Sequence, residues 1–471
     1  MNEKNVGISE ETLVSNTEVV PAKKLPQYIA SLSATLGALT VGTILGWTAV
    51  AGADGQKLID LYNINITSTD FSWIGSLTTL GAAGICIPIG ILADVIGRKY
   101  TMLLMVVPLT LGWLLLIFAN SLTMFFIGRL ILGFTVGAFC VTIPMYIAEI
   151  AEDEIRGRLG SYFQLLLAIG VSFVYILGSF VNMRELSIIS AVVPFIFFGT
   201  FIFMPETPMY YLKKGNEEGA KKSLTKLRGT QYNVENELRV YRESLEETRE
   251  KTTSLFVLLK SKAVKKSFVI SYGLMIFQQL SGVNVSAFYA GTLLAETGDS
   301  MFVSYSISIM GIIQIFAIFI STLVVDHLGR RILLMVSAIF MCLTTLAIGV
   351  YFYLTEIGED VSEIKWLPII SICLFGIMFS IGFGPLPWMM MGEVFAPEVK
   401  GIAASGACVL NWLLAFIVTK FFDDLKQAIN VGPTYWLFSV ICAIGTLFVY
   451  IFVPETKGKS LVEIQRELNT S

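Results

Sequence analysis

The polar residues that could bind a ligand inside this chain are amides and indoles, which lie within long apolar segments. They are Gln164, Gln278, Gln279, Asn284, Gln314, Trp388, Asn411 and Trp412. An amide both donates and accepts hydrogen bonds, as each hydroxyl of a neutral polyol requires, while an indole can pack against the apolar face of a sugar ring. The group therefore favours an uncharged sugar over an ion or an amino acid as ligand. The alternative is that each amide only joins neighbouring helices.

The residue types that most enzymes and metal sites use are scarce in the chain. His327 is the only histidine, so a His-based catalytic triad or zinc site is hard to build. All six cysteines fall in apolar runs outside any CxxC pair, which is typical of packing residues. The net charge of -3 is too small to indicate a nucleic-acid partner. We therefore predict a protein that is not an enzyme and has no catalytic residue, metal or cofactor.

Helices that cross a lipid bilayer must position the amides and indoles. Of the 471 residues, 55% are hydrophobic and only 15% are charged, whereas a soluble protein has about 25% charged residues. A transmembrane helix needs about 20 mostly apolar residues. Twelve such spans are predicted, at 28–50, 70–93, 100–119, 122–146, 158–181, 186–204, 266–295, 300–325, 331–355, 366–392, 401–423 and 432–454. The predicted fold class is an all-α membrane protein.

Two of these spans must be interrupted if their polar residues are to meet one ligand. At about 100° per residue, a regular helix would point Asn284 well away from Gln278 and Gln279. The three side chains converge only if the helix unwinds near residues 281–282, where a glycine permits it. The Gly-Pro-Leu-Pro run at 384–387 predicts a matching break in the tenth span. Broken helices are common at the binding sites of transporters.

Three charged motifs occur once in each half of the chain, in the same order. The pairs are 94–99 with 326–331, 149–157 with 393–401, and 205–207 with 454–456. Three matches in register indicate duplication of a six-helix unit. Two such bundles around a central cleft are typical of transporters. We therefore predict an N-terminal six-helix bundle at 28–204 and a C-terminal six-helix bundle at 266–454.

The distribution of basic residues predicts which side of the membrane each loop faces. Loops rich in Lys and Arg mark the cytosolic side, and one alternating set of loops holds most of the basic residues. Both tails, 1–27 and 455–471, then lie in the cytosol. Residues 205–265 are dense in Lys, Arg and Glu with a few spaced apolar residues. We expect a short helical cytosolic linker domain there, with a solvated linker as the alternative.

Acids and bases at the ends of the spans form a second set of candidate functional residues. They are Asp94, Arg98, Arg129, Glu149, Arg156, Glu206, Asp326, Arg330, Arg331, Glu393 and Lys400. Pairs among them could hold the cytosolic side shut and separate when the bundles rock, because partly buried ion pairs are stronger than exposed ones. The alternative is static anchoring of the helix ends. Arg129 lies deeper in its span and should have a partner or a water-filled cavity.

At this point the motifs resemble those of the sugar porter family of the major facilitator superfamily. The motifs are 94–99, 144–157, 205–208, 278–284, 384–388 and 454–458. The chain is similar to animal facilitative glucose transporters and especially to insect facilitated trehalose transporters. The resemblance implies the major facilitator fold, alternating access, and sugar contacts at the amides and at Trp388, with Trp412 lining the inner side of the cavity. It also implies an N-linked glycan at Asn65, in an Asn-Ile-Thr sequon of the first external loop.

Several residues depart from the glucose-transporter pattern. Ser380 stands where many of those proteins have glutamate, Ala415 where they often have a sugar-binding asparagine, and Phe288 where they have a tyrosine. These departures put glucose as the preferred substrate in doubt and are compatible with a disaccharide. The sequence leaves trehalose and a hexose such as glucose open as substrates.

The first span carries no group that could couple transport to protons. Proton-coupled relatives have an aspartate where this chain has Thr48, and residues 28–53 contain no aspartate or glutamate. We therefore expect a facilitator that moves sugar down its gradient. We expect it to lie in the plasma membrane. The alternatives are a proton-coupled sugar symporter and a sugar sensor that binds without transporting. A membrane enzyme is a further alternative, and it lacks a reactive cluster among these side chains.

Overall fold

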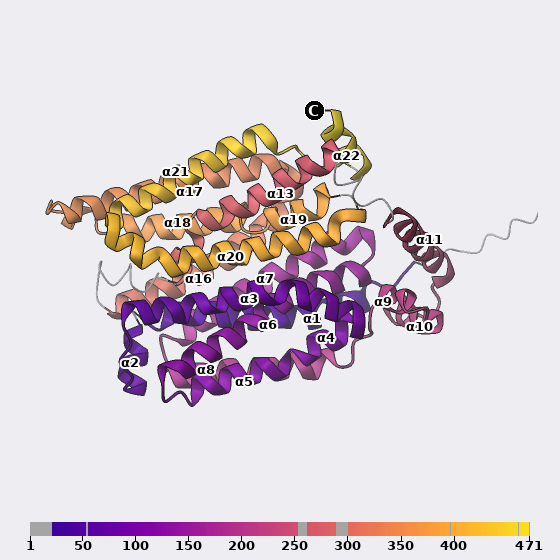
Figure 1. Cartoon of the computed structure of the whole chain (residues 1–471), viewed down its shortest axis with the longest axis horizontal. Helices are drawn as coiled ribbons and strands as arrows, with labels where there is room; N and C mark the ends of the chain where they lie inside the picture. Colours follow the sequence, from indigo (N-terminus) through magenta and orange to yellow (C-terminus); the bar gives the residue numbers. More distant parts are fainter. Residues whose placement is uncertain are drawn as a thin grey trace, which may run out of the picture.

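The computed structural model of the chain describes residues 21–52, 55–252, 261–288, 300–395, 397–459 and 461–470. Long helices lie roughly side by side in two stacked bundles, with the N-terminal bundle below the C-terminal one in Figure 1. In the described part of the chain, twelve helical segments are long and apolar enough to cross a membrane. The predicted number of spans is therefore confirmed.

Helices of the N-terminal bundle follow the predicted spans closely. They are α1 (Leu25–Val50), α3 (Ser68–Ile96), α4 (Arg98–Leu104) continued by α5 (Val106–Ile117), α6 (Leu122–Ile150), α7 (Asp153–Leu177) and α8 (Met183–Phe201). A short helix α2 (Gln56–Tyr62) lies between the first two spans. Close packing depends on small residues: a Cβ on Gly42 of α1 would lie 2.1 Å from the backbone oxygen of Leu167 of α7. Such backbone contact is typical of membrane helices.

The C-terminal bundle contains two interrupted spans. Its helices are α13 (Lys262–Leu280), α14 (Val283–Phe288), α16 (Ser300–Leu328), α17 (Arg330–Glu356), α18 (Leu367–Ile381), α19 (Leu386–Val394), α20 (Pro397–Ile429) and α21 (Val431–Phe452). A 3-10 turn, Ser362–Ile364, precedes α18. Helix α20 continues past the predicted end at residue 423, because Asp423 and Lys426 form an ion pair of 3.1 Å one turn apart and so extend the helix beyond its apolar part.

Shorter helices gather at one end of the bundles. They are α9 (Pro208–Lys213), α10 (Glu217–Arg228) and α11 (Val234–Thr252) between the bundles, and α22 (Leu461–Thr470) at the C-terminus. Figure 1 shows them on the right, at the same end as the turn between α3 and α4. We call this end, which carries Arg98 and Arg330, the basic end. The other end carries α2 and residues 357–366, and we call it the opposite end.

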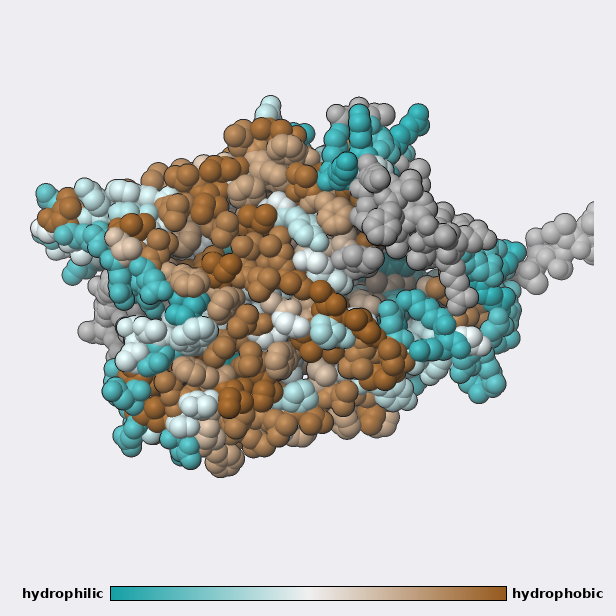
Figure 2. All heavy atoms as spheres, viewed as in Figure 1, coloured by the Kyte–Doolittle hydropathy of each residue, from teal (hydrophilic) through white to brown (hydrophobic). Residues whose placement is uncertain are grey.

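The surface agrees with a protein that lies in a bilayer. Large apolar side chains are exposed along the outer faces of the helices, for example Ile91, Phe316 and Leu447, which are 63%, 64% and 56% exposed. Figure 2 shows hydrophobic surface over the middle of the molecule, while hydrophilic residues gather toward its two ends. Hydrocarbon around the bundle can accept such an apolar surface, and water cannot.

The two bundles contact each other toward the opposite end. Ser172 of α7 donates to the backbone oxygen of Gly311 of α16 at 2.7 Å, and the hydroxyls of Ser179 and Ser308 lie 3.1 Å apart. Across the other side of the interface, Lys420 of α20 bonds to α3. These hydrogen bonds between the two bundles, with that of Ser308 to the backbone oxygen of Tyr175, lie on this side of their midpoint. The bundles are therefore closed against each other at the opposite end.

Candidate substrate-binding site

The predicted break in the seventh span is confirmed. Helix α13 ends at Leu280 and α14 begins at Val283. Gly282 lies between them with φ of +87°, a left-handed conformation that glycine adopts without the steric cost of a side chain. The turn brings Asn284 back toward Gln279, and the Asn284 side-chain amide donates to Gln279 Oε1. An unbroken helix could not join these two residues.

Four predicted site residues form one chain of hydrogen bonds. Gln279 Nε2 donates to Asn411 Oδ1 at 2.8 Å, and Asn411 Nδ2 donates to Gln278 Oε1 at 2.7 Å. Gln278, Gln279 and Asn411 are 3%, 7% and 1% exposed, while Asn284 is half-buried. The chain thus joins both segments of the seventh span to α20. Each bond fixes the direction in which the neighbouring amide points, which preorganises whatever donors and acceptors remain.

The break in the tenth span is also confirmed, and Gln278 braces it. Helix α18 ends at Ile381 and α19 begins at Leu386, which leaves backbone groups without helical partners. Gln278 Nε2 donates to the freed oxygens of Phe383 at 2.6 Å and Gly384 at 2.9 Å. Non-helical backbone inside a membrane needs such partners. The side-chain N–H groups of Gln278 therefore hold helices together, as the alternative interpretation of the amides expects.

Three other predicted residues keep unused hydrogen-bonding groups. Gln164 of α7 and Gln314 of α16 are half-buried, and their side-chain amides form no hydrogen bond within the described part of the chain. Trp412 of α20 is 8% exposed, and its indole N–H has no acceptor there. A buried N–H without a partner costs about 1–3 kcal/mol. These groups come from both bundles, so a ligand that bonds to all of them must lie between the bundles.

Trp388 contributes an aromatic face from the helix that follows the second break. It is half-buried on α19 and packs against the same hydrophobic cluster that contains Trp412. This cluster combines side chains of both bundles. Trp388 and Trp412, the residue after Asn411, thus offer aromatic faces from the C-terminal bundle, which suit a ligand with both apolar faces and hydroxyls.

Arg129 is held by neutral groups, which corrects its assignment to the ion-paired set. It is fully buried and donates to the backbone oxygens of Ile44 at 2.9 Å and Ile74 at 3.0 Å, and to Thr48 Oγ1 at 2.7 Å. Its guanidinium lies 5.3 Å from the ring of Trp47. No carboxylate within the described ranges forms an ion pair with it. Three acceptors and a ring together offset the cost of burying the charge.

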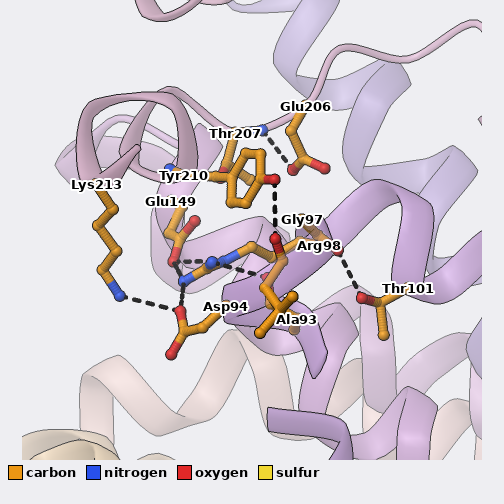
Figure 3. Close-up of polar contacts among 11 residues, drawn as sticks. Ala93, Asp94, Gly97, Arg98, Thr101, Glu149, Glu206, Thr207, Tyr210 and Lys213 are labelled. Atoms are coloured by element: carbon orange, nitrogen blue, oxygen red, sulfur yellow. Dashed lines mark hydrogen bonds and ion pairs between the residues drawn. The ribbon is translucent and has the colours of Figure 1, made fainter. Parts of the chain in front are cut away.

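Arg98 is the centre of the charged cluster at the basic end of the N-terminal bundle (Figure 3). It is 1% exposed and lies 2.9 Å from Asp94 Oδ1 and from Glu149 Oε1. Lys213 of α9 reaches the same Asp94 oxygen at 3.1 Å. The cluster joins α3, α4, α6 and α9. Lys213 was not among the residues predicted from the sequence. The one feature that could have indicated it is its position a few residues after the 205–207 motif.

Glu206 accepts hydrogen bonds from backbone N–H groups. Its carboxylate accepts from the N–H of Lys99 at 2.9 Å and from its neighbour Thr207 at 2.7 Å. Gly97 makes this approach possible, because a Cβ there would lie 2.3 Å from Glu206 Oε2. Burial raises the pKa of Glu206, and the two backbone bonds oppose that shift. Figure 3 shows Glu206 and Thr207 beside the turn that contains Gly97 and Arg98.

The C-terminal bundle repeats this arrangement with looser geometry. Arg330 lies 3.3 Å from Glu393 Oε1, and Glu455 accepts from the backbone N–H groups of Arg330 at 3.0 Å and Arg331 at 3.1 Å. Burial opposes the ionisation of Glu455, but its backbone hydrogen bonds together outweigh burial and lower its pKa. Glu455 thus occupies the place that Glu206 has in the first bundle. The sequence repeat at 454–456 was the signal for it.

The ion pairs Arg98–Glu149 and Arg330–Glu393 each lie within one bundle. Arg156 donates to the backbone oxygen of Ala151 at 3.4 Å. The side chains of Asp326 and Lys400 lie outside the described residues. Arg98 and Arg330 therefore tie helix ends together inside their own bundles in this closed arrangement of the opposite end.

Asn65 lies at the opposite end, in the segment between α2 and α3, and its side chain is exposed. Thr67, the third residue of its sequon, caps α3 by accepting from the N–H of Asp70 at 3.2 Å. The position is therefore accessible from the surface at the end of the molecule that lacks the charged clusters.

Sequence comparison identifies the family of this site. A family model described as "Sugar (and other) transporter" matches residues 24–468. The chain belongs to this family of transporters. It is 39% identical over 444 residues to a facilitated trehalose transporter Tret1 of Bombyx mori, covering 94% of this chain and 87% of the relative. It is 38% identical over 448 residues to a Tret1-2 homolog of Drosophila sechellia, covering 94% and 91% of the two proteins. The family and these relatives are transporters rather than enzymes, as predicted.

Solved structures support the fold of the transporter. The xylose transporter XylE of E. coli in a partially occluded inward open conformation aligns with a TM-score of 0.78 and 22% identity, covering 92% of this chain and 99% of that protein. A second XylE structure, a proton:xylose symporter bound to a bromodeoxyglucose, gives a TM-score of 0.79 at 22% identity, covering 94% and 99%. The transporter is thus a multi-pass membrane protein with the major facilitator fold.

Proposed function

We propose that the transporter carries a neutral sugar across the membrane by alternating access, with trehalose or a hexose such as glucose as the substrate. One observation carries this proposal. Unused hydrogen-bonding groups of Gln164, Gln314 and Trp412, drawn from both bundles, accompany a preorganised chain of amides. A sugar hydroxyl supplies both the donor and the acceptor that these groups lack.

Two small residues favour trehalose as the substrate. Ala415 is one turn of α20 from Asn411 and is fully buried, and Ser380 is 5% exposed in α18. Residues four apart share a face of a helix, so Ala415 lies on the amide-bearing side of α20. Shorter side chains at these positions leave room for a second sugar ring. The facilitated trehalose transporters among the relatives support the same choice.

Transport is uncoupled in this proposal. Thr48, which bonds to Arg129 at 2.7 Å, cannot exchange a proton at physiological pH. Arg129 is satisfied by neutral acceptors whatever the proton gradient. A proton-coupled symporter and a non-transporting sensor are the alternatives, and the contacts of Thr48 and Arg129 favour neither.

The basic end faces the cytosol in this proposal, and the opposite end faces outside the cell. The charged clusters around Arg98 and Arg330 then act as cytosolic gate elements, and Arg156, Asp326 and Lys400 belong to the same set. Both termini and the linker at 205–265 lie in the cytosol, and the plasma membrane is the expected location. The Arg98 and Arg330 clusters, which repeat the same basic motif, both lie at this end and support this orientation.

Uptake into proteoliposomes tests the proposed function. Purified transporter should take up radiolabelled trehalose to equilibrium, and unlabelled glucose should compete if hexoses share the site. An imposed proton gradient should change neither the plateau nor the initial rate. Accumulation above equilibrium under that gradient would instead support the symporter. Saturable sugar binding without any uptake would support the sensor.

A further inference from the structure

Lys420 is a cation buried in the interface between the two bundles, and no part of the proposed sugar site uses it. It lies near the end of α20 toward the opposite end and is 7% exposed. Its ammonium donates to Ser72 Oγ of α3 at 3.1 Å. A lysine inside a membrane protein is costly and usually marks a functional position.

Two of the partners of Lys420, Ser72 and Trp73, belong to the other bundle. Its ammonium lies 4.9 Å from the ring centroid of Trp73 on α3, and Trp73 in turn packs against Phe416 of α20 at 6.1 Å between ring centroids. Ser72 is 1% exposed and donates its own hydroxyl proton to the backbone oxygen of Thr69 at 2.8 Å. This leaves the Ser72 lone pairs free to accept from the ammonium.

The charge on Lys420 depends on these partners when the bundles are closed. No carboxylate in the described part of the chain lies within ion-pair distance of Lys420, whereas the nearby Lys426 is paired with Asp423 on its own helix at 3.1 Å. A buried ammonium needs an acceptor or an aromatic face to replace water. The hydrogen-bond acceptor and the nearer aromatic face come from α3, so they are lost when α3 and α20 separate, whereas the Phe421 ring, 5.8 Å away on α20, stays beside the ammonium.

We propose that Lys420, Ser72 and Trp73 form a latch that stabilises the closed state of the opposite end. When the bundles separate there, water reaches the ammonium and replaces its bonds to α3. The bond between Lys420 and Ser72 thus shifts the equilibrium toward closure without touching the sugar. The latch rests on the proposed alternating access, because only a carrier that reorients has an open state to compete with.

A disulfide reporter measures closure independently of transport. Ser179→Cys and Ser308→Cys, on the far side of the same interface, replace hydroxyls that lie 3.1 Å apart, a separation that a disulfide can span. The six native cysteines are replaced by alanine in this background. The rate of disulfide formation under mild oxidant, quantified by non-reducing peptide mass spectrometry, then reports the fraction of closed molecules.

Four variants in this background test the latch. Ser72→Ala should shift the closed–open equilibrium about tenfold toward the open state, the loss expected for a hydrogen bond from a charged donor, and slow disulfide formation in proportion to the closed molecules lost. Ser76→Ala is the matched control and should have no effect, because Ser76 is buried one turn away on α3 and its hydroxyl bonds to none of the described residues. Lys420→Met removes the ammonium and gives a reference rate of disulfide formation without the bond to Ser72. Adding Ser72→Ala to Lys420→Met should then change nothing further, because the coupling is already lost.

The outcomes separate the latch from the transport proposal. An equal effect of Ser72→Ala with and without Lys420→Met would overturn the latch, as would an effect of Ser76→Ala as large as that of Ser72→Ala. Size-exclusion profiles identify variants that fail to fold, and Lys420→Arg, which keeps the charge, should restore sensitivity to Ser72→Ala. Absence of sugar uptake by the unmodified chain would overturn the proposed function, while the disulfide rates would still decide the latch.

Discussion

Individual amides in this transporter serve two purposes that a sequence does not separate. The side-chain N–H groups of Gln278 donate to backbone oxygens of the interrupted tenth span. The side-chain amides of Gln164 and Gln314 form no hydrogen bond with the described residues. Gln279 lies between these cases, because it donates to Asn411 and accepts from Asn284. Its loss would disturb both the bracing of the helices and the direction of the groups that face a sugar.

Gln279→Ala should weaken sugar binding by about tenfold or more, because it removes the acceptor of Asn284 Nδ2 and the donor to Asn411 Oδ1 in a buried site. Equilibrium binding of radiolabelled trehalose to purified transporter measures the effect. Gln56→Ala is a suitable control, since Gln56 is exposed in α2 and its side-chain amide donates to Asp60 on the same helix. Affinity equal to that of the unmodified chain would remove Gln279 from the site.

Thr48→Asp should convert the facilitator into a carrier that responds to protons. The new carboxylate would replace the hydroxyl that accepts from Arg129 Nη2 at 2.7 Å, and it could gain and lose a proton as the site opens to each side. Proteoliposomes would then accumulate sugar by up to about tenfold for each unit of an imposed pH gradient.

Thr48→Asn isolates the carboxylate in that experiment. It offers Arg129 an acceptor of the same shape as aspartate but no titratable group, so uptake should stop at equilibrium. Accumulation by the asparagine variant, or none by a well-folded aspartate variant, would contradict the role assigned to residue 48.

At the scale of elements, the breaks in two helices determine the site. The turn at residues 281–282 brings Asn284 back to Gln279, and the gap between α18 and α19 exposes carbonyl groups that Gln278 caps. Each break contains a glycine, Gly282 or Gly382, at a place where a neighbouring side chain leaves no room for a Cβ. At Gly382, a Cβ would lie 2.4 Å from that of Ser337.

Gly282→Ala should destabilise the folded transporter by about 1–2 kcal/mol, because alanine at a φ of +87° is strained. Its Cβ would also lie 2.9 Å from the Phe438 ring. Thermal unfolding followed by size exclusion, together with initial rates of uptake, measures both consequences. Gly199→Ala in α8, where a Cβ would meet no atom within 4 Å, should change neither. Equal behaviour of the two variants would show that the turn tolerates a side chain.

At the scale of the whole molecule, closure at the opposite end and charged clusters at the basic end define two different ends of the carrier. Hydrogen bonds join the bundles at one end, while the ion pairs Arg98–Glu149 and Arg330–Glu393 each join helices of a single bundle. With the basic end in the cytosol, this arrangement is the inward-facing one. The latch at Lys420 would then oppose opening toward the outside.

Glycosylation of Asn65 tests this orientation. The residue is exposed between α2 and α3 at the opposite end, so expression in insect cells should yield a product whose gel mobility increases on treatment with an N-glycosidase. Asn65→Gln should migrate at the deglycosylated position. Asn469, in an Asn-Thr-Ser sequon, lies in α22 at the basic end, and the same substitution there should have no effect. A glycan at Asn469 would reverse the assigned topology.

The sequence by itself determined the number of spans, the repeat of the two bundles and the positions of both helix breaks. These properties depend on local composition and on glycine and proline, which act within a few residues of their place in the chain. The departure of Arg129 from the ion-paired set could not be foreseen. Its acceptors are backbone oxygens of two other helices, and every residue carries such an oxygen.

Only the tertiary structure decided which amides brace helices, which keep free N–H groups, and that Lys420 bonds to Ser72, 348 residues away in sequence. The physical reason is that hydrogen bonds in a membrane interior are satisfied by whichever groups packing brings within about 3 Å. Residue type sets what a side chain can donate or accept, and the packing of the two bundles sets whether a partner is there.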